Sequence, residues 1–116
     1  MTSKKEKDVK STREEVGFST DGGSLKAEIF CEVDHHVAKR IRERIDERLF
    51  LYRPTVLILD FSAVRFMDSS GIALIFGRVE SAKAVGATVR IEGLTPELSR
   101  LLRLSGAERV RGLYVG

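Results

Sequence analysis

The stretch TVLILDFSAVRFMDSSGIALIFG, residues 55–77, decides the fold of this 116-residue chain. It opens with a continuous apolar run at 56–59, whose length and aliphatic composition predict a central strand buried on both faces. Beyond the tetrad Asp-Ser-Ser-Gly at 68–71, the apolar residues recur at helical spacing, at Ile72, Ile75, Phe76 and Val79. The tetrad therefore lies where the loop after a central strand leads into a helix.

The residues Asp68, Ser69 and Ser70 suit the first turn of that helix. Asp and Ser side chains accept hydrogen bonds from the free backbone N–H groups found there. The same N–H groups and the positive end of the helix dipole also favour a bound anion. A phosphate on a serine adds about −1.5 to −2 charges at pH 7. The N-terminus of the helix tolerates this charge, but the charge and size of the phosphate would oppose the docking of a partner protein. The residues are consistent with simple helix capping and with a phosphorylation switch.

The residues before this stretch predict a hairpin. A short strand over 16–19 is followed by a turn at 20–24 that contains Asp-Gly-Gly, and residues 25–33 alternate between apolar and polar. Cys31 falls in the apolar row of the second strand. We interpret it as a core side chain and not as a reactive thiol.

A helix is predicted from residue 35 to about residue 51, with Asp34 as its N-cap. Its inner stripe is formed by Val37, Ile41, Ile45 and Leu49. The remaining positions are mostly charged, which is typical of a solvated face and, alternatively, of a face that binds phosphate or nucleic acid. His35 and His36 are interpreted as polar residues of the helix start, because two adjacent histidines do not have metal-ligand spacing.

The second half of the chain continues the alternation of strands and helices. The helix after the tetrad extends to about residue 85, followed by a strand at 88–91, a helix entered at Thr95-Pro96, and a last strand over 109–115. This order predicts an α/β domain with a mixed, mostly parallel sheet. Asp34 and Asp68-Ser69 each follow a strand end, which is where sites form in such sheets.

Composition fits a single globular domain over residues 15–116, preceded by a charged extension at 1–14 that we expect to be disordered. The net charge of +3 is too small to predict nucleic-acid binding by itself. No apolar run has membrane-spanning length, and no leader pattern is recognised at the start. The single cysteine fits a reducing compartment.

Motifs for catalysis are absent from the sequence. There is no Gly-x-Ser-x-Gly, no phosphate-binding Walker loop and no Gly-x-Gly-x-x-Gly. A serine hydrolase would require His35 or His36 to lie beside Ser69 and act as its base. We therefore expect a binding protein without enzymatic activity and without a cofactor or metal of its own.

Two segments, Glu-Val-Asp-His-His at 32–36 and Phe-Met-Asp-Ser-Ser-Gly at 66–71, resemble the anti-sigma factor antagonists of the STAS superfamily, including those of sporulation. The resemblance spans about residues 16–112 and includes Leu-Ser-Gly at 104–106. It implies a cytoplasmic domain whose helices pack on one side of a mixed sheet. Members usually have a further helix after the last strand, for which this sequence has no residues.

The resemblance also implies a function. The unphosphorylated protein would bind an anti-sigma factor that is also a serine kinase, which supplies ATP and Mg²⁺, and would thereby release a sigma factor. Phosphorylation of Ser69 would end this binding, and a serine phosphatase would reverse it. The partner surface carried over from the family consists of Asp34, His35, Asp68, Ser69, Ser70 and Gly71. We expect no direct nucleic-acid or membrane binding, and a monomer or weak dimer. The alternative is a STAS module of a stress-signalling scaffold or a transport accessory.

Overall fold

The computed structural model describes residues 15–116, so the predicted extension at 1–14 lies outside the described part. Within residues 15–116, nine elements follow one another: β1 (Val16–Asp21), β2 (Ser24–Ile29), α2 (His35–Tyr52), β3 (Val56–Asp60), α3 (Ser69–Lys83), β4 (Thr88–Glu92), α4 (Pro96–Leu104), the 3₁₀ helix η1 (Ala107–Arg109) and β5 (Leu113–Val115). The predicted alternation of strands and helices is confirmed.

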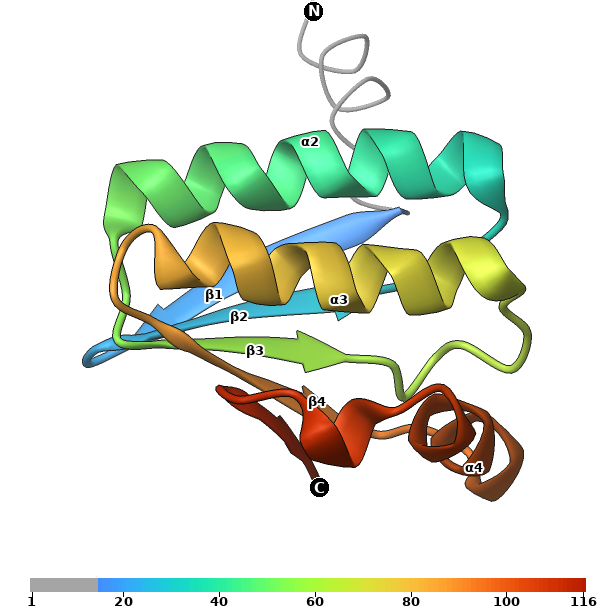
Figure 1. Cartoon of the computed structure of the whole chain (residues 1–116). Helices are drawn as coiled ribbons and strands as arrows, with labels where there is room; N and C mark the ends of the chain where they lie inside the picture. Colours follow the sequence, from blue (N-terminus) through green and yellow to red (C-terminus); the bar gives the residue numbers. More distant parts are fainter. Residues whose placement is uncertain (1–14) are drawn as a thin grey trace, which may run out of the picture.

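The five strands form one sheet, and their order in the sheet is their order in the chain (Figure 1). The hairpin pair β1–β2 is antiparallel, and its two-residue turn is formed by Gly22-Gly23, with Gly22 at φ 62°. The pairs β2–β3, β3–β4 and β4–β5 are parallel. The sheet is therefore mixed and mostly parallel, as predicted.

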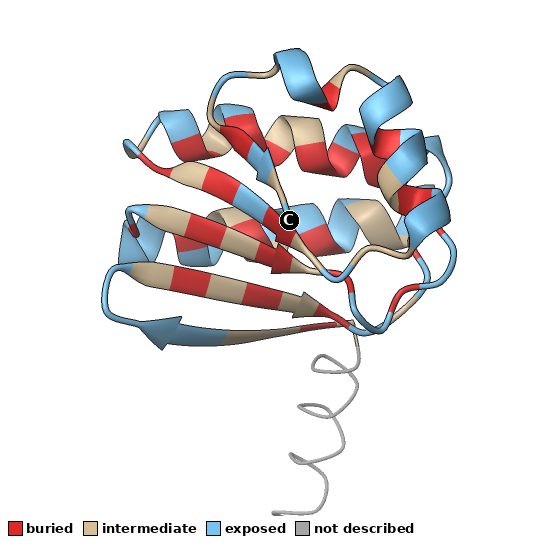
Figure 2. Cartoon of the chain, turned by 90° about the horizontal axis from the view of Figure 1, so that it is seen from below, coloured by how far each residue is buried: buried red, intermediate tan, exposed pale blue. Residues whose placement is uncertain are grey.

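Helices α2 and α3 lie side by side across one face of the sheet (Figure 1). From α2, the predicted stripe buries Ile41, Ile45 and Leu49 completely. Every second residue of the strands faces these helices, so buried residues alternate with half-buried or exposed ones along β2, β3 and β4 (Figure 2). The core thus lies between one layer of helices and one face of the sheet.

The prediction that the central strand is buried on both faces is wrong. In β3, Leu57 and Leu59 are fully buried, whereas Val56 and Ile58 are only half-buried. The physical reason is that α2 and α3 cover only one face of the sheet. The apolar residues of the run at 56–59 that point to the other face are therefore less buried than the prediction assumed.

Two predicted strands are too long. β2 ends at Ile29 and not at Val33, because its neighbour β3 ends at Asp60. Directly after β3, the Asp60 carboxylate accepts hydrogen bonds from the backbone N–H and the hydroxyl of Ser62 (2.9 and 2.6 Å). The last strand begins only at residue 113, since η1 occupies part of the predicted span.

Candidate functional site

The loops that precede α2 and α3 are joined by backbone hydrogen bonds. The N–H of Val33 donates to the carbonyl oxygen of Phe66 (3.3 Å), and the N–H of Asp68 donates to the carbonyl oxygen of Val33 (3.2 Å). These bonds make an isolated parallel bridge between Val33 and Met67, both of which are buried. Two segments more than thirty residues apart in sequence are thereby held next to each other at one edge of the domain.

Each of these loops ends in an aspartate that caps the following helix. Asp34 Oδ1 accepts a hydrogen bond from the N–H of Val37 (2.9 Å), and Asp68 Oδ1 accepts one from the N–H of Ser70 (2.8 Å). The Val37 hydrogen bond is the main cause that holds the pKa of the Asp34 carboxyl below its usual value. Both carboxyls are exposed, so they are helix caps and also part of the surface.

The next three residues differ in exposure. Ser69 is the first residue of α3 and is exposed, Ser70 is half-buried, and Gly71 is buried. A Cβ atom added to Gly71 would lie 2.6 Å from Met67 Sδ and 2.9 Å from Met67 Cβ. Gly71 therefore lets α3 pack closely against its own entry loop, and Ser69 is the hydroxyl most open to another protein.

His35 is exposed at the start of α2, and its ring centroid lies 4.1 Å from that of His36. Among residues 15–116 no hydrogen bond joins the Ser69 hydroxyl to either histidine, so the described contacts do not include the nucleophile–base pair that a hydrolase needs. Within the same range, no three His, Cys, Asp or Glu side chains are grouped to hold a metal ion.

A depression of about 220 Å³ lies between the two joined loops, and we call it the loop pocket. Its lining residues are Glu32, Val33, Asp34, Phe66, Met67 and Asp68. Three of these six side chains are carboxylates, and the Phe66 ring beside them is 70% exposed. Sequence reasoning did not name Phe66 or Glu32 as site residues. The signal available for Phe66 was a large apolar side chain in the loop between a strand and the helix that follows it.

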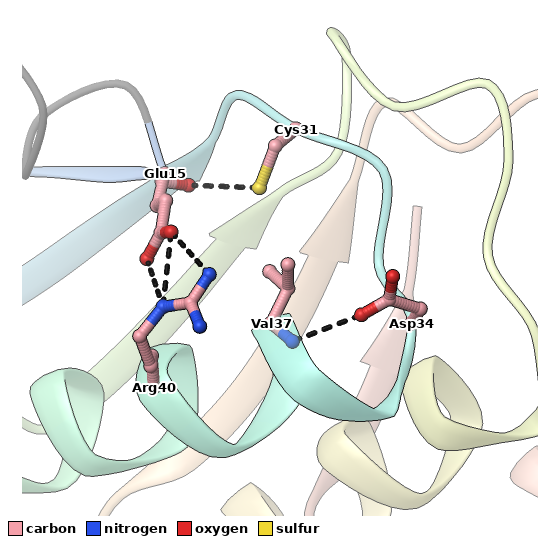
Figure 3. A network of polar contacts seen from close by, with 5 residues as sticks. All are labelled: Glu15, Cys31, Asp34, Val37 and Arg40. Atoms are coloured by element: carbon pink, nitrogen blue, oxygen red, sulfur yellow. Dashed lines mark hydrogen bonds and ion pairs between the residues drawn. The ribbon is translucent and has the colours of Figure 1, made fainter.

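Cys31 lies just outside this pocket, close to the start of β1 (Figure 3). Its thiol donates a hydrogen bond to the carbonyl oxygen of Glu15 (3.8 Å), and the Glu15 carboxylate forms a two-pronged ion pair with Arg40 of α2. Burial, followed by the charge of Glu15, raises the pKa of the Cys31 thiol. Cys31 is half-buried against the core, which agrees with its interpretation as a core side chain.

Comparison with known protein families matches residues 20–114 to the STAS domain. The chain belongs to the STAS domain family. A protein of Lysinibacillus sphaericus named anti-sigma F factor antagonist is 30% identical over 101 residues, which cover 76% of this chain and 86% of that protein. The resemblance seen in the sequence is confirmed.

Two solved structures extend the comparison. The anti-sigma factor antagonist SpoIIAA in its unphosphorylated form has a TM-score of 0.72 and 25% identity, covering 87% of both chains. SpoIIAA in the phosphorylated form has a TM-score of 0.67 and 25% identity, covering 87% of this chain and 90% of that one. The fold predicted for this STAS domain is thus that of SpoIIAA.

Residues 15–116 contain no helix that is both long enough and apolar enough to cross a membrane.

Proposed function

We propose that this STAS domain is an anti-sigma factor antagonist whose binding is switched by phosphorylation of Ser69. The observation that carries the proposal is the pairing of Val33 with Met67, which brings Asp34 and Asp68-Ser69 onto one exposed surface. Both segments resemble the antagonists, and a relative named as such is 30% identical. The partner is an anti-sigma factor with serine kinase activity, and it brings the ATP and Mg²⁺.

The surface proposed for the partner consists of the loop pocket and the residues at the two helix starts. Asp34, His35, Asp68 and Ser69 are exposed there, Ser70 is half-buried beside them, and Gly71 lies below as the packing residue. This protein acts by binding and catalyses no reaction itself. It works in the cytoplasm, where kinase, phosphatase and sigma factor are found.

Phosphorylation would act on docking and not on the fold. The exposed Ser69 hydroxyl leads into the first turn of α3, where free N–H groups and the helix dipole tolerate a phosphate. A partner closing over it would have to desolvate about −1.5 to −2 charges and make room for three oxygens. A loss of ~3 kcal/mol of docking energy lowers affinity by more than a hundredfold, which is enough for an on–off switch.

The test is the intact mass of the protein after incubation with ATP, Mg²⁺ and anti-sigma kinases encoded in the same genome. The wild type and Ser70→Ala should each gain one phosphate, and Ser69→Ala should gain none. Ser69→Asp should keep its circular-dichroism spectrum and lose kinase binding. If no kinase modifies the wild type, or if Ser69→Asp binds as tightly as the wild type, the switch is wrong. Either result would favour the alternative function, a STAS module of a stress-signalling scaffold or a transport accessory.

A further inference from the structure

A second depression, of about 360 Å³, runs between α2 and α3, and we call it the helix groove. Three of the residues that line the groove have little or no side chain, namely Ala38 from α2 and Ala73 and Gly77 from α3, and this leaves space between the two helices. A Cβ atom added to Gly77 would have no heavy atom within 4 Å. The groove is therefore open space into which a side chain of another molecule fits.

Cationic side chains surround the helix groove. Lys39 and Arg42 of α2 line it and are exposed, and within residues 15–116 neither forms an ion pair. Arg78 of α3 also lines it, although its side chain is only 6% exposed. Its Nη1 pairs with Asp46 and its Nε donates to the carbonyl oxygen of Leu74, which leaves Nη2 without a hydrogen bond in the described part. None of the described residues that line the groove carries a carboxylate.

The helix groove and the loop pocket meet at the two helix starts and are opposite in charge. Asp34 lines the loop pocket and the next residue, His35, lines the helix groove. In the same way Asp68 lines the pocket and Ser70 lines the groove. A protein that covers the loop pocket and extends along α2 and α3 would thus cross from a negative surface to a positive one. Complementary charges of this kind fix the orientation of a partner and increase its rate of association.

We infer that the helix groove binds an acidic segment of the protein that docks on the loop pocket. The groove takes one or more carboxylate side chains, with Lys39 and Arg42 as the outer cations and the free Nη2 of Arg78 as the inner donor. This inference rests on the proposed function for the identity of the partner. The groove itself is a property of this chain, so its ability to bind carboxylates can be measured separately.

Three variants test the groove. Lys39→Glu/Arg42→Glu reverses its outer charge, and Gly77→Leu fills its floor without changing any charge. Arg100→Glu/Arg111→Glu is the matched control, because it makes the same change in net charge at exposed positions outside the groove. Circular dichroism and thermal unfolding of each variant establish that the fold is kept.

The first measurement is a titration of the ¹⁵N-labelled protein with an acetylated deca-glutamate peptide, followed by amide chemical shifts. The amides of residues 39–42 and 73–77 should shift in the wild type and in the control, and should not shift in either groove variant. Shifts spread over other basic surfaces, or equal shifts in the groove variants, overturn the inference.

The second measurement is affinity for the anti-sigma kinase at low and high ionic strength. Both groove variants should bind about tenfold more weakly than the control, and the charge-reversal variant should also lose most of its salt dependence. Equal affinities overturn the inference. If the wild type binds no kinase, the proposed function fails, and the peptide titration alone decides whether the groove is an acidic-segment site.

Discussion

The ion pair between Arg78 of α3 and Asp46 of α2 leads to a prediction about stability. The Arg78 side chain is 6% exposed and that of Asp46 is 27% exposed, so the two partners are buried to different degrees. Removing one partner of a buried pair is costly because it leaves the other charge without compensation. The loss in free energy of unfolding should therefore depend on which partner is removed. It should be larger when Asp46 is removed and the Arg78 cation is left without its partner.

We expect Asp46→Ala to lower the free energy of unfolding by roughly 2–3 kcal/mol, because the buried Arg78 cation then has, among residues 15–116, only the Leu74 carbonyl as a partner. Arg78→Met should cost only about 1 kcal/mol, since the apolar stem is kept and the Asp46 carboxylate recovers hydration. The double variant Asp46→Ala/Arg78→Met should be more stable than Asp46→Ala alone. In a domain of this size, the Asp46→Ala loss corresponds to a fall in Tm of roughly 10 °C.

The assay is equilibrium unfolding in urea, followed by far-ultraviolet circular dichroism, for the two single variants and the double variant. Glu80→Ala is the control, because its ion pair with Lys83 is between side chains that are 76% and 51% exposed and should contribute at most about 1 kcal/mol. The reasoning is refuted if Arg78→Met lowers the free energy of unfolding as much as Asp46→Ala does. It is also refuted if the loss of unfolding free energy in the double variant equals the sum of the losses in the two single variants.

Three further predictions concern single residues near the site. Gly71→Ala should destabilise the domain by about 1–3 kcal/mol, because the added Cβ atom collides with Met67. Gly77→Ala in the same helix should be neutral or stabilising by up to about 1 kcal/mol. Chemical denaturation compares the two variants, and an equal loss of stability in both would contradict the packing account. Cys31 should react more slowly with iodoacetamide in the folded protein than in urea at the same pH, because its raised pKa leaves little thiolate; equal rates, read by mass spectrometry, would mean that the thiol is not shielded. Because the pKa of Asp34 is lowered in the folded protein, its carboxylate stabilises the fold at pH values above the ordinary pKa of the group. This contribution is lost as the pH falls through the folded-state pKa. The stability difference between wild type and Asp34→Asn should therefore move in favour of the Asn variant on acidification, and a difference independent of pH would argue against the capping bond.

Much of the candidate site was predictable because helix starts are local features. Asp34 was expected as an N-cap, and Asp68 was one of three residues expected to cap the next helix; both accept backbone hydrogen bonds from those helices. Glu32 and Phe66 were missed, because their importance depends on lying beside each other in one pocket. Whether the predicted residues bind a partner stays a prediction, which the kinase experiment decides.

The sequence by itself determined the order of the strands and helices, the mostly parallel sheet and the inner stripe of α2. These features follow from apolar period, turn residues and caps, all of which act over a few residues. The same local patterns failed where burial depends on distant neighbours. The run at 56–59 could not reveal that α2 and α3 cover only one face of β3.

Only the tertiary structure decided which surfaces the site presents. Three features join segments that are distant in sequence: the bridge between Val33 and Met67, the burial of Arg78 against Asp46, and the helix groove between α2 and α3. In each case the sequence supplies the side chains, but the packing of α2 against α3 and the pairing of their entry loops set which charges face one another. That is why the loop pocket is acidic and the adjacent groove is basic, although a single loop or helix carries only part of either surface.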